Sequence, residues 1–141
     1  MENRTILIAA IFLISLFLIG CATEAPPNFE GTAWKLDTYL SNVDHLVSPI
    51  SSTKLTLEFK DGRISGSSGC NSFFANYDVE GKSMSFGLIG ATKMFCSNPG
   101  VMEQEQTYLS RLESIKSYKL EGNKLSLIDG NGKPVLVYSK N

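Results

Sequence analysis

The sequence has few of the side chains that build catalytic and metal centres. Its 141 residues include one histidine, one tryptophan and three cysteines. A catalytic nucleophile needs a base that a further group holds in place, and a zinc centre needs several nitrogen or thiolate ligands. The single His45 follows Asp44 in a loop sequence, where we expect a solvated side chain. We therefore expect no enzymatic activity, no cofactor and no metal site.

Charge of one sign is also scarce. The 13 Lys and Arg residues nearly balance the 14 Asp and Glu residues, which leaves a formal net charge of −1. Neither a basic run nor an acidic tail occurs, whereas proteins that bind nucleic acid through its phosphates carry clear positive charge. Nucleic acid is therefore not an expected partner. The length allows one domain.

A long hydrophobic run occurs only at the N-terminus. Residues 6–19 are apolar except for Ser15 and span about 14 residues. A helix needs roughly 20 such residues to cross the hydrocarbon core of a membrane. The run, which follows a short start containing Arg4, is therefore typical of the apolar part of an export signal peptide.

The end of this run, Leu18-Ile19-Gly20-Cys21, resembles a bacterial lipobox. In such signals the cysteine thiol receives diacylglycerol, and a peptidase cuts before the cysteine. We therefore predict a signal peptide at residues 1–20, a lipid (palmitate-containing) modification at Cys21 and a tether at residues 21–30. The alternative is an uncleaved N-terminal anchor with an incidental cysteine.

A lipid anchor on a soluble domain holds a protein on a membrane rather than within it. We expect the chain in the cell envelope, on the outer side of the plasma membrane or on the periplasmic face of an outer membrane. Ala22 follows the cysteine where an inner-membrane retention signal usually has Asp, which favours the outer membrane in a bacterium with two membranes. We also expect a monomer.

From Gly31 onward, short alternating runs between turn residues predict a mainly β fold. Leu55, Leu57 and Phe59 alternate with polar residues, and the hairpin-turn dipeptide Asp61-Gly62 follows. Other predicted strands cover residues 33–40, 63–67, 73–79, 83–86, 89–94, 115–120, 124–128 and 134–138, and residues 42–52 are predicted to form a loop. This regular spacing predicts a small antiparallel β-barrel over residues 31–141.

One segment has helical spacing instead. The residues at this spacing are Val101, Met102, Glu105, Tyr108, Leu109 and Leu112, which are apolar except for Glu105. Asn98 is a residue type that caps helices, and Pro99 suits a first helical turn. The sequence thus predicts one helix over residues 99–113, packed over an end of the sheet.

Cys70 and Cys96 remain once Cys21 is assigned to the lipid. Two cysteines in an exported domain most often form a disulfide, and this one would close a loop of roughly 26 residues. Two buried free thiols and a redox-active pair are the alternatives. The sequence has no C-x-x-C spacing, and no histidine flanks either cysteine, so nothing in it favours redox chemistry.

Several other residues have structural interpretations. We expect Trp34 in the core, Asn71 bonded to the backbone of its own turn, and the glycines around Cys70 at a positive φ or a close backbone approach. Asp61, Asp129 and Asn131 are typical of turns, which accounts for them without a calcium site.

An ordered set of short motifs resembles the META domain, as found in HslJ-like heat-shock lipoproteins. The motifs are Gly31-Thr32-Ala33-Trp34-Lys35-Leu36; Phe59, Gly62, Ile64, Gly66, Gly69-Cys70-Asn71, Phe74 and Tyr77; Thr92-Lys93-Met94-Phe95-Cys96; a helix with Glu103, Tyr108 and Leu112; and Leu125-Ser126-Leu127 with Leu136-Val137-Tyr138. The resemblance covers nearly the whole chain after residue 30. It implies a compact barrel-like fold with a helix. It also implies an association, in some members, with heat shock, envelope stress or resistance to novobiocin, and no established reaction.

These observations predict a non-enzymatic envelope lipoprotein that supports stress tolerance by binding other envelope components, such as an envelope protein. Two alternatives stay open. A small barrel can carry one apolar ligand, and a hydrolase or redox enzyme would use His45, Cys70 or Cys96.

Overall fold

A computed structural model describes residues 25–141. The predicted signal peptide at residues 1–20 and the predicted lipidation site at Cys21 lie outside the described residues. Within residues 25–141, no helix combines the length and the apolar character that crossing a membrane requires.

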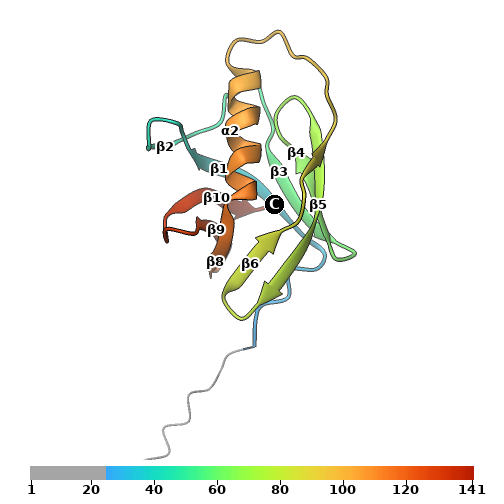
Figure 1. Ribbon diagram of the computed structural model, residues 1–141, viewed down its shortest axis with the longest axis vertical. Coiled ribbons are helices and arrows are strands. Elements are labelled where there is room, and N and C mark those ends of the chain that lie inside the picture. The colour runs from blue at the N-terminus through green and yellow to red at the C-terminus, as the bar shows by residue number, and fades with distance from the viewer. Residues whose placement is uncertain (1–24) are drawn as a thin grey trace, which may run out of the picture.

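The described chain forms a closed antiparallel β-barrel with one helix packed against it (Figure 1). Around the barrel the strands pair in the order β1-β3-β4-β5-β6-β8-β9-β10, and β10 pairs again with β1. Their bounds are β1 Thr32–Leu40, β3 Thr56–Lys60, β4 Arg63–Ser67, β5 Ser72–Glu80, β6 Ser83–Phe86, β8 Ile115–Glu121, β9 Lys124–Asp129 and β10 Pro134–Lys140. The mainly β, barrel-like fold predicted from the sequence is confirmed.

The alternating pattern sets the inside and outside of the barrel as predicted. Leu57 and Phe59 on β3 are buried, as is Trp34 on β1. Asp61 and Gly62 join β3 to β4 with φ values of 53° and 71°, and positive φ at both central residues is the mark of a type I′ hairpin. The hairpin twist therefore matches the twist of the two strands.

The interior of the barrel is filled by its own side chains. The largest fully buried side chains include Phe59, Phe73, Tyr108 and Tyr138. The hydroxyls of Tyr108 and Tyr138 lie 2.9 Å apart and satisfy each other, as buried polar groups must. An aromatic core of this kind fills the barrel with protein atoms.

The helix α2 (Val101–Glu113) starts later and differently than predicted. The N-cap is Gly100 at φ 77°, with no side-chain cap, so the prediction of Asn98 as cap and Pro99 in the first turn is wrong. The Asn98 carbonyl accepts a hydrogen bond from the Val101 amide, which forms a turn ahead of the helix. The turn therefore takes the place of a side-chain cap.

Two short strands lie beside the barrel. β7 (Gly90–Ala91) pairs with β5, and it is much shorter than the strand predicted over residues 89–94. β2 (Leu46–Val47) pairs with β1 within the predicted loop. The Thr92 amide still donates to the Ser72 carbonyl of β5 at 3.0 Å, but the backbone of Met94 bonds the Asn71 side chain instead of extending β7.

The chain is fixed to the barrel from Phe29 onward. The Phe29 ring is buried, with its centroid 5.1 Å from that of Phe59 and 5.0 Å from that of Tyr118. The neighbouring Glu30 carboxylate accepts hydrogen bonds from the Asp61 and Gly62 amides of the β3–β4 turn. Residues 25–28 therefore leave from a defined point, at the end of the barrel away from the start of α2 (Figure 1).

Candidate functional site

A buried carboxylate, Glu105, stands at the centre of the densest polar cluster in the described chain. Its side chain points from α2 toward the connection between β4 and β5, and the residue is only 6% exposed. One carboxylate oxygen lies 2.6 Å from the Ser68 hydroxyl and 2.7 Å from the Asn71 amide nitrogen, and it also accepts the Cys70 amide at 3.2 Å. The other oxygen accepts a hydrogen bond from the Asn71 side-chain amide at 2.6 Å.

These donors decide the ionisation of Glu105. Burial alone raises the pKa of this carboxyl, but the hydrogen bonds from Ser68, Asn71 and Cys70 together outweigh burial and lower the pKa below its ordinary value. A carboxylate that accepts several N–H and O–H bonds is stabilised in its charged form. Glu105 is thus an ionised anchor whose oxygens are already occupied, a poor arrangement for a general acid or base.

Asn71 joins this anchor to the segment after β7. Its side-chain oxygen accepts hydrogen bonds from the Met94 amide and the Thr92 hydroxyl, both at 2.7 Å. Its side-chain nitrogen also donates to the Met94 carbonyl at 3.1 Å. The Asn71 carbonyl accepts the Ser68 amide of its own turn at 2.8 Å, as predicted, but the partners of the Asn71 side chain come from residues 92–94 and from the helix.

The disulfide between Cys70 and Cys96 completes the same cluster. The two Cα atoms lie 5.9 Å apart, and the bond closes a sequence separation of 26 residues, so the predicted pairing is confirmed. The Cys96 amide also donates to the Met102 sulfur on α2 at 3.5 Å. We call the set Ser68, Cys70, Asn71, Thr92, Met94 backbone, Cys96 and Glu105 the Glu105 hub.

Glycine makes the β4–β5 connection possible. A Cβ atom at Gly66 would stand 2.0 Å from the Thr56 carbonyl oxygen, and Gly69 has a φ of 112°. Both the close approach and the positive φ predicted for this region are confirmed. The connection can therefore turn its amides toward Glu105.

The other predicted polar residues do not gather into a site. His45 is exposed, and the neighbouring Asp44 carboxylate pairs with Lys133 at 2.5 Å across the surface. Cys70 and Cys96 lie in the hub rather than near His45. Within residues 25–141, no group of three or more His, Cys, Asp or Glu side chains is arranged to hold a metal ion.

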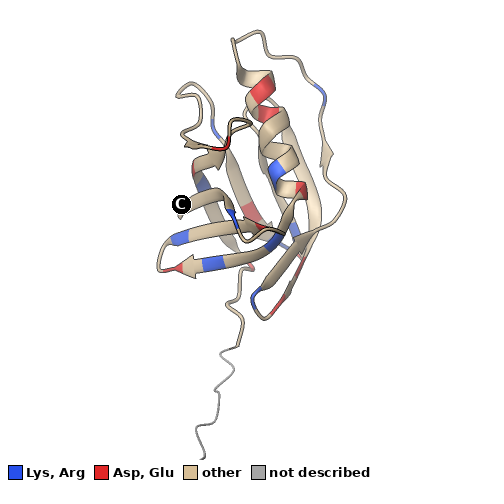
Figure 2. Ribbon diagram, turned by 60° about the vertical axis from the view of Figure 1, so that its left-hand side comes forward, with Lys and Arg blue, Asp and Glu red and all other residues tan. Residues whose placement is uncertain are grey.

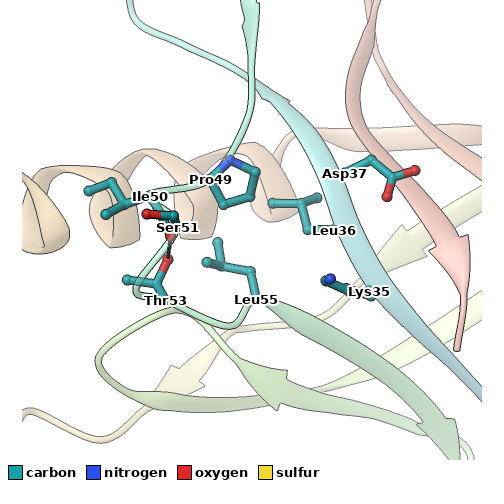
Figure 3. A pocket seen from close by; sticks show the side chains of 8 residues that line it. All are labelled: Lys35, Leu36, Asp37, Pro49, Ile50, Ser51, Thr53 and Leu55. Atoms are coloured by element: carbon teal, nitrogen blue, oxygen red, sulfur yellow. Dashed lines mark hydrogen bonds between the residues drawn. The ribbon is translucent and has the colours of Figure 1, made fainter.

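A shallow open cleft of about 300 Å³ lies between β1 and the loop before β3 (Figure 3). Lys35 and Asp37 stand on its β1 side, and Ile50 and Thr53 on its loop side. Gln104 fixes this loop, since its side chain accepts the Ile50 amide at 2.6 Å and donates to the Thr53 hydroxyl at 3.0 Å. The cleft has polar and apolar walls but no buried catalytic group.

The sequence did not show the role of Gln104 and Glu105, the two buried polar side chains of α2. The motif comparison singled out Glu103, yet Glu103 is exposed, while Gln104 and Glu105 are buried. The available signal was the helical period, since positions 104 and 105 follow Val101 at the spacing that also buries Tyr108 and Leu112. The period does not tell which partners these two side chains meet.

Solved structures share this fold at low sequence identity. A protein from Burkholderia xenovorans, determined by NMR, superposes with a TM-score of 0.67 at 23% identity, covering 84% of this chain and 93% of its own. A second protein determined by NMR gives a TM-score of 0.61 at 23% identity, covering 79% of this chain and 90% of its own. A crystal structure of a DUF4847 family protein from Bacteroides vulgatus gives 0.54 at 17% identity, covering 80% and 94%. These similarities concern the fold.

Among curated proteins, no sequence matches this chain significantly. The sequence profile of the META domain, in contrast, matches residues 27–141. That range contains the whole barrel, the helix and every residue of the Glu105 hub. The chain therefore belongs to the META domain family.

Proposed function

We propose that this chain is a lipid-anchored, non-enzymatic module of the cell envelope that binds other envelope components. The observation that carries the proposal is the use of its three cysteines. Cys70 and Cys96 form a disulfide, the state of cysteine pairs in oxidising compartments outside the cytosol. Cys21 ends a lipobox-like sequence after a short apolar run, which suits export followed by acylation.

The chemistry of the Glu105 hub favours a structural role for these residues over a catalytic one. Its carboxylate, amides and hydroxyl are paired with one another, and no buried side-chain nitrogen or oxygen in the described chain lacks a partner. A catalytic group needs a free lone pair or proton within reach of a substrate. The hub instead holds the β7–α2 connection against the barrel.

The carrier hypothesis has less support. Fully buried aromatic side chains occupy the interior of the barrel, so an apolar ligand finds room only in an open cleft such as the one beside Lys35 and Asp37. Ligand sites usually enclose most of the ligand surface. Native mass spectrometry tests this alternative, because a carrier retains an adduct and the proposed module does not.

Intact mass analysis of the protein from native membranes tests the proposal. The expected product starts at an acylated Cys21 and shows two thiols that react with an alkylating agent only after reduction. A full-length, unacylated chain with three free thiols would overturn the proposed location. Affinity capture from envelope extracts, after heat or antibiotic stress, then tests binding, and the absence of any specific partner would count against the proposed role in stress tolerance.

A further inference from the structure

The segment between β6 and α2 exposes large apolar side chains that the barrel does not use. Leu88 is 95% exposed, Phe95 82%, Met94 60%, and Phe74 on the adjoining strand β5 51%. Phe74 belongs with them because its ring covers Gly90 of β7, where a Cβ atom would stand 2.8 Å from the ring. We call these four residues the apolar strip.

The apolar strip is held in place by its backbone rather than by its side chains. Asn71 of the Glu105 hub bonds the amide and the carbonyl of Met94, and the disulfide fixes Cys96 one residue after Phe95. The segment runs beside β5 and arches past the start of α2 (Figure 1). The hub therefore presents the strip to the surroundings in one conformation.

The connection between β6 and α2 carries little charge, and that charge is positive. Between Lys82 and Glu103, a stretch of 20 residues, Lys93 is the only charged residue, and Figure 2 shows basic colour on this connection. Arg63 adds a second cation, since its guanidinium carbon lies 5.1 Å from the centre of the Phe74 ring. Apolar side chains flanked by cations match the boundary between acyl chains and anionic headgroups.

The chain before the barrel limits how far this surface is from a membrane. Phe29, which is buried, follows Cys21 by eight positions, and a fully extended chain gains about 3.5 Å per position, so an acyl anchor at Cys21 keeps the barrel within about 28 Å of the bilayer surface. The tether leaves at the end away from the start of α2 (Figure 1). A barrel lying on its side then brings both the tether and the strip to the same bilayer.

We propose that the apolar strip docks on the phospholipid bilayer that holds the lipid anchor; this inference rests on the proposed function. The four strip residues line neither the cleft beside Lys35 nor the one beside Tyr77, and their side chains are half to almost fully exposed. A fluid bilayer accepts projecting apolar groups at its interface, whereas a protein partner gains most from fully desolvated pockets.

Quenching by brominated lipid tests this docking, because the chain has a single tryptophan. Trp34 is 2% exposed and gives a constant background. The test protein is the acylated full chain with Phe95→Trp, reconstituted in vesicles of phosphatidylethanolamine and phosphatidylglycerol with brominated acyl chains. The matched control is Val43→Trp, at a 73% exposed position before β2. We expect quenching of the indole at position 95 to exceed that at position 43 about threefold or more.

A second variant tests whether the quenching at position 95 depends on the other residues of the apolar strip. Adding Leu88→Ser to Phe95→Trp removes one exposed apolar group and is expected to reduce quenching at position 95 by about half. Both substitutions lie at exposed positions, so circular dichroism should show the same folded barrel.

The outcomes separate this proposal from the proposed function. Acylated protein with equal or absent quenching at positions 95 and 43 overturns docking by the strip and leaves the lipid anchor in place. Protein whose mass shows no acyl group overturns the anchor. In that case the same protein is mixed with the same vesicles: quenching at position 95 still supports the strip, and its absence overturns the strip as well.

Discussion

The barrel and the β7–α2 connection are stabilised in opposite ways. In the barrel, Leu57, Phe59 and Ile64 are completely buried and stabilise the fold through the hydrophobic effect. In the connection, Leu88 and Phe95 face solvent, and the backbone is held by the Asn71 side chain and a disulfide. One sequence therefore contains a part that is fixed by burial and a part that is fixed by a few polar and covalent bonds.

This difference predicts that a substitution in the barrel destabilises the whole fold, whereas a substitution in the connection destabilises only that segment. Loss of a buried aromatic side chain weakens the whole barrel, because every strand shares the core. Loss of a hub contact frees mainly the connection, since the strands around the barrel do not depend on residues 92–96 for their pairing. Local opening of such a segment costs less than global unfolding.

The largest expected effect is that of Phe59→Ala. Its ring is completely buried and packs against Phe29 and Tyr77, and truncating a buried Phe costs about 3–5 kcal/mol. Phe74→Ala is the matched control, because that ring is about half exposed. Urea unfolding followed by circular dichroism measures both. Equal losses of stability for the two variants would contradict the division between barrel and connection.

Removal of the disulfide comes next. The double substitution Cys70→Ser with Cys96→Ser opens a loop with a sequence separation of 26, which is worth about 3.5 kcal/mol in the chain-entropy model. We expect a lower melting temperature with the barrel still folded. Hydrogen exchange should rise most in residues 87–100, and uniform exchange across all strands would show that the disulfide supports the barrel itself.

Substitution of Glu105 tests the polar half of the hub. Glu105→Ala leaves the Ser68 hydroxyl and the Asn71 and Cys70 amides without their acceptor, and leaving buried donors unpaired costs about 1–3 kcal/mol. Glu105→Gln keeps one acceptor oxygen and is expected to lose less. Urea unfolding ranks the variants, and Glu103→Ala on the exposed side of α2 is the control. A loss for Glu103→Ala equal to that for Glu105→Ala would argue for a helix effect instead.

The sequence predicted the barrel well and the β7–α2 connection poorly. Alternation of period two placed Leu55, Leu57 and Phe59 inside correctly, because a strand and its buried face are local properties of the chain. The pairing of Cys70 with Cys96 followed from their number and the predicted compartment. The partners of Asn71 and of Glu105 did not follow, since Glu105 bonds residues 34 to 37 positions away. Such contacts depend on where the barrel places α2.

The smallest expected effect, and the finest test of the comparison, is acid sensitivity of the connection. The pKa of Glu105 is lowered in the folded protein from an ordinary value near 4.5. A group with a depressed folded pKa stabilises the fold fully above its unfolded pKa, and this contribution disappears as the pH falls through the folded value.

Other carboxyls, such as Asp129, also have a lowered pKa, so the comparison of wild type with Glu105→Gln isolates the hub. Below about pH 4.5, we expect faster hydrogen exchange at the Asn71 and Met94 amides of the wild type, while the amides of the buried strands stay protected. In the Glu105→Gln variant, we expect the exchange of these two amides to change less with pH. If strands β3 and β9 lost protection at the same pH as Met94, the hub and the barrel would be one cooperative unit, and the connection would have no stability of its own.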